Sequence, residues 1–181
     1  GCAAGLLRQL GIEAKKLQWK VAGINHQAWL LEVTDGGEDL YPMIREKAAE
    51  RNREEKHNNM IRYEMIRFFG YYVTESSEHS AEYMPYWIKR NYPELIDRYN
   101  IPLDDYPKRC VHQIEQWEKQ REELVHNSEI GHTRSHEYCS RMIEAMETDV
   151  PFRVHGNVLN TGRLIANLPD KACVEVPCMV D

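Results

Sequence analysis

Two segments rich in Val, Leu, Ile and Trp, residues 18–23 and 28–34, flank the tetrapeptide Gly-Ile-Asn-His at 23–26. Aliphatic and aromatic side chains in runs of this length favour strands, so the pattern predicts two strands with Asn25 and His26 between them. The sequence Asp-Gly-Gly at 35–37 predicts a turn after the second strand. This part of the chain is therefore expected to contribute strands to a sheet.

Most of the remaining chain has helical patterning, and its last part is again strand-like. Helices are predicted over residues 41–53, 60–69, 106–127 and 135–148, strands over 152–158, 164–167 and 172–180, and the end of a helix with a turn over 6–17. Gly70 is expected to end the second of these helices, and Ser135 is a candidate N-cap of the last one. This order of elements predicts an α+β fold with a mostly antiparallel sheet packed with helices.

The composition excludes several classes of protein. The chain has 23 Lys and Arg against 29 Asp and Glu, a net charge of −6, which argues against a nucleic-acid partner. No apolar run approaches the roughly 20 residues of a membrane span, and no secretory leader is visible. Five cysteines without a Cys-x-x-Cys pair indicate neither a disulfide framework nor a structural zinc site. We therefore expect one cytoplasmic domain of 181 residues with reduced thiols and no membrane partner.

Asn25 and His26 are a first candidate for chemistry, because a turn at a strand end can direct both side chains into a cleft. Imidazole is a good ligand for a divalent metal, so His26 is a candidate metal ligand. The alternative is a hydrogen-bonded turn without a ligand, and the local pattern alone favours this alternative.

A second candidate is the polar cluster Thr-Glu-Ser-Ser-Glu-His at 74–79, which lies among aromatic residues. Carboxylates, hydroxyls and an imidazole beside aromatic faces suit a sugar, whose hydroxyls need polar partners. The same sequence also fits the start of a helix with Thr74 or Ser76 as N-cap, and this alternative is favoured on pattern alone. Tyr63 is a candidate general base only where a nearby cation lowers its pKa from about 10, and a structural tyrosine is the simpler interpretation.

Several strings taken together resemble one family. They are residues 22–29 (AGINHQAW), 62–65 (RYEM), 70–79 (GYYVTESSEH), 102–110 (PLDDYPKRC), 156–158 (GNV), 167–169 (NLP) and 173–181 (CVEVPCMVD). In this order they resemble glycoside hydrolase family 4, in particular its α-galactosidase branch. The string at 74–79 is also similar to the uronidase-type members, and Gln27 stands where the α-galactosidase branch usually has Met.

The resemblance implies a fold like that of lactate and malate dehydrogenases and an oxidation–elimination–addition mechanism that depends on NAD⁺ and a divalent metal, usually Mn²⁺. This mechanism differs from the two-carboxylate chemistry of most glycosidases. By resemblance, His26 falls on the family's metal-binding histidine, Asn25 on a sugar-contacting residue and Tyr63 on the tyrosine proposed as the base at the sugar C2. Glu75, Ser76, Glu78 and His79 occupy the region that reads the sugar.

No Gly-x-Gly-x-x-Gly or Walker sequence occurs in the chain, so we predict no NAD-binding Rossmann domain in it, and its cofactor-binding residues are unknown. Residues 1–181 are expected to form the substrate and dimerisation domain of an enzyme acting on α-galactosides. The isolated chain is expected to bind no cofactor and to be inactive, and to form homo-oligomers. The alternatives are a truncated, non-catalytic, self-associating homologue, or a member of the α-glucuronidase/galacturonidase branch.

Overall fold

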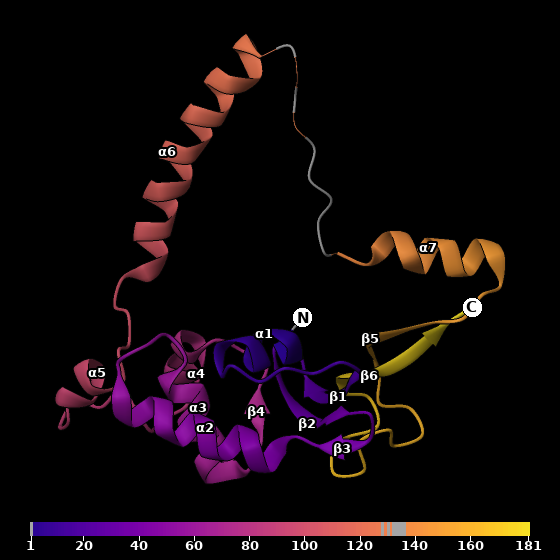
Figure 1. Cartoon of the computed structure of the whole chain (residues 1–181), viewed down its shortest axis with the longest axis horizontal. Helices are drawn as coiled ribbons and strands as arrows, with labels where there is room; N and C mark the ends of the chain where they lie inside the picture. Colours follow the sequence, from indigo (N-terminus) through magenta and orange to yellow (C-terminus); the bar gives the residue numbers. More distant parts are fainter. Residues whose placement is uncertain (1, 128, 130, 132–136) are drawn as a thin grey trace.

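The computed structural model describes residues 2–127, 129, 131 and 137–181. The described residues form seven helices and six strands (Figure 1). The helices are Cys2–Gln9 (α1), Tyr41–Glu54 (α2), Met60–Phe69 (α3), Ser77–Tyr83 (α4), Glu94–Arg98 (α5), Asp105–His126 (α6) and Cys139–Thr148 (α7). The strands are Leu17–Ile24 (β1), Gln27–Asp35 (β2), Glu38–Asp39 (β3), Tyr72–Val73 (β4), Phe152–Leu159 (β5) and Cys173–Val180 (β6).

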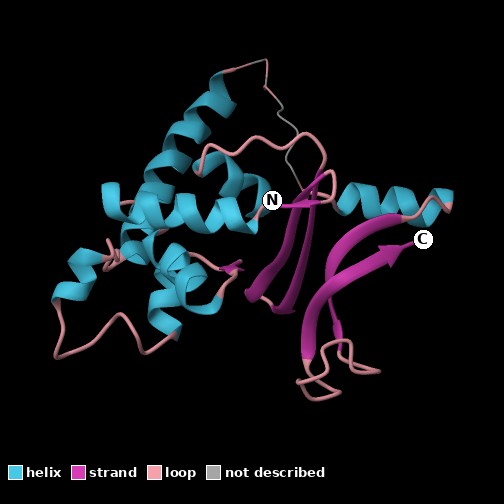
Figure 2. Ribbon diagram, turned by 60° about the horizontal axis from the view of Figure 1, so that its bottom comes forward, coloured by secondary structure: helices cyan, strands magenta, loops and turns pink. Residues whose placement is uncertain are grey.

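The strands form one sheet in the order β3-β2-β1-β6-β5, with β4 paired to β2, and every pairing is antiparallel. The β1–β2 hairpin and the β5–β6 hairpin come from opposite ends of the chain and meet where Gly23 pairs with Glu175. Figure 2 shows most helices on one side of β1 and β2 and the long β5–β6 hairpin on the other. The predicted α+β fold with a mostly antiparallel sheet is confirmed.

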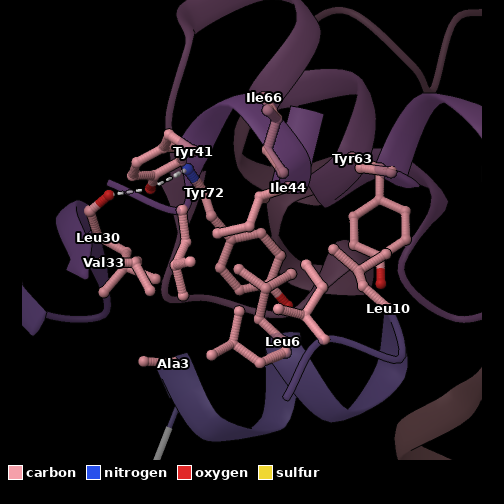
Figure 3. Close-up of a cluster of buried hydrophobic side chains, with 14 of the residues drawn as sticks. Ala3, Leu6, Leu10, Leu30, Val33, Tyr41, Ile44, Tyr63, Ile66 and Tyr72 are labelled. Atoms are coloured by element: carbon pink, nitrogen blue, oxygen red, sulfur yellow. Dashed lines mark hydrogen bonds between the residues drawn. The ribbon is translucent and has the colours of Figure 1, made fainter. Parts of the chain in front are cut away.

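The main core lies between one face of the β1–β2 hairpin and the first helices (Figure 3). Ala28, Leu30 and Val33 of β2 are fully buried there, and side chains from α1, α2 and α3 pack on them. Tyr41 lies inside this core, where its hydroxyl donates to the Leu30 carbonyl and accepts the Tyr72 backbone N–H at 3.3 Å. Burial raises the pKa of Tyr41 to about 12, so this hydroxyl stays protonated and links α2 to β2 and β4.

Helix α6 projects away from this body in Figure 1. None of its residues is buried in the part of the chain that the structure describes. The apolar side predicted from the sequence is present, and its members Val111, Ile114, Trp117 and Leu124 are all exposed. No described helix is both long and apolar enough to cross a membrane.

Two predictions for the last third of the chain concern a strand at 164–167 and an N-cap at Ser135. The strand predicted over 164–167 is wrong, because these residues form turns and bends in the β5–β6 connection. Asn160, which is fully buried, binds the Ile165 backbone N–H and the carbonyls of Ile165, Leu168 and Pro169. The Ser135 N-cap lies outside the described residues, and the described helix α7 begins at Cys139.

Gly23 is the position in β1 that a side chain cannot occupy. Its φ is +147°, and an added Cβ would lie 2.8 Å from the Ala28 Cα. We therefore expect Gly23→Ala to destabilise the chain by about 2 kcal/mol, since it combines backbone strain with a clash against backbone atoms. Thermal unfolding followed by circular dichroism measures this.

Gly5 provides the matched control for this substitution. It lies in α1 with nothing within 4 Å of an added Cβ. Gly5→Ala should therefore raise the melting temperature, because alanine is the better helix former by about 1 kcal/mol. Equal effects of the two variants would contradict the proposed clash at Gly23.

Candidate functional site

The candidate site begins at the turn between β1 and β2. The strand pairing ends at Ile24 and Gln27, which leaves Asn25 and His26 as the two turn residues, joined by a cis peptide bond. The His26 side chain is 77% exposed. An exposed imidazole at the end of a hairpin is accessible to a ligand, which the role implied for His26 by the family resemblance would require.

Glu75 brings two histidines together at this turn. Its Oε1 accepts the Ser76 backbone N–H at 2.7 Å and lies 3.1 Å from His79 Nδ1. Its Oε2 lies 3.7 Å from His26 Nδ1, while only 13% of the Glu75 side chain is exposed. The structure thus gathers His26, Glu75 and His79, three of the residues predicted for the site, around one carboxylate.

The electrostatics of this group follow from its burial and charges. Burial opposes ionisation of Glu75, but the Ser76 N–H, His79 and the charge of His26 together outweigh it and lower its pKa. The hydrogen bond to Glu75 raises the pKa of His79 above its ordinary value, although partial burial opposes this. Each shift favours the charged form of its group, so the Glu75 carboxylate and the His79 imidazolium stabilise each other.

The charged pair gives stability a defined pH dependence. Glu75 contributes above its ordinary pKa of 4.5 and loses its contribution as pH falls through its lower folded value. His79 contributes below its ordinary pKa of 6.5 and loses its contribution as pH rises through its higher folded value. We therefore expect Glu75→Gln to destabilise the chain most between pH 4.5 and pH 6.5, the ordinary pKa values of the two groups, by up to about 1 kcal/mol.

Chemical denaturation at three pH values, one inside and one on each side of this window, measures the effect. Glu32→Gln is the matched control, because Glu32 pairs with Lys20 at 3.2 Å on the surface without a histidine. A difference that stays constant across the three pH values would contradict the Glu75–His79 pairing.

Ser76 and Glu78 have partners within the chain. Ser76 is the N-cap of α4, and its Oγ accepts the His79 backbone N–H at 3.1 Å, so the helix start that the sequence suggested is present. Glu78 lies 3.5 Å from Arg109, which pairs with Asp105 at 2.7 Å. Burial and the nearby Asp105 raise the pKa of Glu78. These contacts fix the start of α4 and leave the Glu78 carboxyl less acidic than usual.

Tyr63 lies apart from the other predicted site residues. It is buried on α3 in the main core (Figure 3), and its hydroxyl donates to Gln9 Oε1 at 3.3 Å. Its ring packs on those of His57 and Tyr72. Burial raises the pKa of Tyr63, whereas a general base needs a lowered one. Among the described residues, its contacts do not include His26 or Glu75.

The residues at the turn fit part of a metal site. A catalytic metal usually has about three protein ligands. No group of three or more His, Cys, Asp and Glu side chains in the described ranges is arranged to hold a metal ion. His26 can supply one imidazole nitrogen, and Glu75 one nearby carboxylate.

Two further residues contact this site: Arg62, which the sequence did not single out, and Thr74, which was considered only as part of the polar cluster and as a helix N-cap. The Thr74 hydroxyl lies 2.8 Å from the His26 carbonyl oxygen, and the Arg62 guanidinium binds the carbonyls of Val73 and Thr74. Arg62 precedes Tyr63 in the string at 62–65 that resembles the family, and this position was the only sequence feature that indicated it.

Comparison with known proteins identifies the family. Residues 21–181 match the family 4 glycosyl hydrolase C-terminal domain. The chain belongs to glycosyl hydrolase family 4. Within this family it is 59% identical over 180 residues to an α-galactosidase of Bacillus subtilis. The aligned region covers 99% of this chain and 41% of that protein. An α-galactosidase of Rhizobium meliloti is 32% identical over 185 residues, covering 95% of this chain and 36% of that protein.

Solved structures of several glycosidases have the same fold as this family 4 chain. The crystal structure of lplD from Bacillus subtilis, a candidate glucosidase, has a TM-score of 0.76 at 21% identity and covers 99% of this chain and 44% of that one. A 6-phospho-α-glucosidase from gut microorganisms in complex with NAD and Mn²⁺ has a TM-score of 0.62 at 22% identity, covering 99% and 42%. The chain therefore spans less than half the length of these relatives.

Proposed function

We propose that this chain is the sugar-facing part of a family 4 α-galactosidase. The observation behind the proposal is the 59% identity to the Bacillus subtilis α-galactosidase over nearly the whole chain. Because the chain spans 41% of that protein, the complete activity would involve residues that the present chain does not include. As a domain, residues 1–181 would provide the substrate-binding and dimerisation surfaces.

In this proposal, bound NAD⁺ would supply a hydride acceptor for the sugar C3 and bound Mn²⁺ a Lewis acid at the C3 oxygen, chemistry that would make the proton on C2 more acidic. The 6-phospho-α-glucosidase that has this fold was solved in complex with NAD and Mn²⁺, which supports the proposal. His26 would provide one metal ligand. Asn25, Glu75, Ser76, Glu78 and His79 would bind and orient the sugar hydroxyls.

Tyr63 is proposed as the residue that removes the C2 proton, by resemblance to the family. Burial raises its pKa, so the surroundings in this chain keep the hydroxyl protonated and do not favour its action as a base. A cation close to its hydroxyl would have to lower the pKa before Tyr63 could act as a base. The isolated chain is therefore expected to have no turnover. It is also expected to bind no NAD⁺, because its sequence contains no Gly-x-Gly-x-x-Gly or Walker sequence.

We propose that the protein is a cytoplasmic homo-oligomer. All five cysteines are unpaired, as is usual in a reducing compartment. The exposed apolar side of α6 favours self-association, because apolar patches of this kind usually mark interfaces. A self-associating module without activity remains the second candidate function, and the following experiment separates the two.

The test is a chimera in which this chain replaces the matching 180 residues of the Bacillus subtilis α-galactosidase. Hydrolysis of 4-nitrophenyl α-galactoside that requires both NAD⁺ and Mn²⁺ would support the proposal. Activity on 4-nitrophenyl α-glucuronide or α-galacturonide instead would assign the chain to the uronidase branch. A folded chimera that hydrolyses none of these substrates would contradict the enzymatic proposal and favour the self-associating module.

A further inference from the structure

Thr74 connects the loop that contains Glu75 to the turn that contains His26. Its hydroxyl oxygen lies 2.8 Å from the His26 carbonyl oxygen and 3.1 Å from that of Ala28, so it can donate to either. Its backbone N–H donates to the Ala28 carbonyl at 2.8 Å. These contacts extend the β2–β4 pairing by one residue and fasten it to the turn.

Arg62 supports the same loop from α3. Its Nε and Nη2 donate to the Val73 carbonyl at 3.1 Å and 2.9 Å, and Nη2 also donates to the Thr74 carbonyl at 3.1 Å. The guanidinium carbon lies 3.9 Å from the centre of the Tyr72 ring. Within the described part of the chain no carboxylate pairs with Arg62. Its other side-chain partners are Asn59 Oδ1, which accepts from Nη1 at 3.3 Å, and Cys2 Sγ, which lies 3.1 Å from Nη2.

A second contact from Arg62 reaches the helix that follows the loop. The Arg62 backbone N–H donates to Ser77 Oγ at 3.2 Å, at the start of α4. Arg62 therefore binds the loop both before Glu75 and after it. Lysine would keep the backbone contact to Ser77, but its ammonium group lacks the planar fork with which the guanidinium reaches the carbonyls of Val73 and Thr74.

We propose that Arg62 and Thr74 are positioning residues that set the separation between His26 and Glu75. The proposal rests on the proposed function, in which these two side chains serve metal and sugar. The present separation of 3.7 Å is too long for a hydrogen bond, so it leaves the imidazole free for a ligand while the carboxylate stays beside it. Binding groups of this kind must be held to within about 0.5 Å, which the exposed turn cannot achieve alone.

Amide hydrogen exchange of the isolated chain tests the positioning without any activity. Thr74→Val removes the hydroxyl but keeps the shape, and Thr74→Ser restores it. We expect Thr74→Val to speed exchange by about fivefold in segments 24–28 and 72–79, with α2 unchanged, and Thr74→Ser to behave like the native chain. Arg62→Lys should speed exchange in the same two segments.

Thr148→Val is the matched control, because the Thr148 hydroxyl also bonds a backbone carbonyl, that of Glu144 at 2.7 Å, but at the end of α7. It should leave segments 24–28 and 72–79 unchanged. Native exchange in Thr74→Val, or faster exchange that includes α2, would overturn the proposal.

The second readout uses the chimera described above. We expect Thr74→Val to lower kcat/KM by about tenfold and to raise the Mn²⁺ concentration needed for half-maximal activity, with recovery in Thr74→Ser. Faster exchange together with an unchanged kcat/KM would overturn the positioning role. An inactive parent chimera would count against the proposed function, and the exchange measurement would still decide whether Thr74 and Arg62 hold the turn.

Discussion

Replacing His26 with Ala in the chimeric α-galactosidase is expected to lower kcat/KM for 4-nitrophenyl α-galactoside by at least about 100-fold. Loss of groups that merely orient a ligand costs about 10- to 100-fold, so loss of a ligand itself should cost at least the upper value. The His26 side chain is 77% exposed and makes only a long contact with Glu75, so its removal should leave the stability of the chain nearly unchanged. Kinetic assays over a range of Mn²⁺ concentrations, with a thermal melt of each variant, measure both effects.

His126→Ala is the control for this variant. His126 is also an exposed histidine beside a carboxylate, with Nε2 at 3.3 Å from Glu122, but it lies on α6. It should keep the kinetics of the parent chimera. Activity in His26→Ala within about twofold of the parent, far from the 100-fold expected for a lost ligand, would exclude His26 as a metal ligand.

Asn160→Ala is expected to destabilise the chain by about 3 kcal/mol, because the buried amide binds one N–H and three carbonyls that would be left unpaired. For a chain of this length, this corresponds to a fall in melting temperature of about 9 °C. Urea denaturation followed by circular dichroism measures the free energy of unfolding.

Asn58→Ala is the matched control for this prediction. Asn58 is exposed, and its side-chain oxygen accepts one bond from Asn100 at 3.3 Å. Its loss should cost less than about 0.5 kcal/mol. If Asn160→Ala were as stable as this control, the β5–β6 connection would not depend on the buried amide.

The role that the family resemblance implies for Tyr63 differs from the role that its buried surroundings favour. The family motif predicts a proton-accepting tyrosine at this position, but the side chain is buried and bonded to Gln9. The local pattern already favoured a structural tyrosine, and the observed burial agrees with it. The sequence could not reveal which groups surround the ring, because they come from α1 and from His57. Whether Tyr63 acts as the base stays a prediction for the complete protein.

The sequence alone determined the elements whose patterns are local. The helix at 60–69 was predicted at its observed bounds, and the β1–β2 hairpin to within a residue at each end. The turn with Asn25 and His26 followed from these strands, and the family followed from the motifs. Local signals were sufficient there because Gly70 ends a helix and a run of strand-forming residues has few alternatives.

Only the tertiary structure decided which residues meet. The two-residue strand β4 pairs with β2, and this pairing places Glu75 beside His26 although they are far apart in sequence. Residues 164–167 have the apolar character of a strand, but the buried Asn160 binds them as a loop. The β4 pairing depends on a strand far away in the sequence, and the loop at 164–167 depends on the burial of the nearby Asn160 by the rest of the fold. A local pattern of apolar residues contains no information about either.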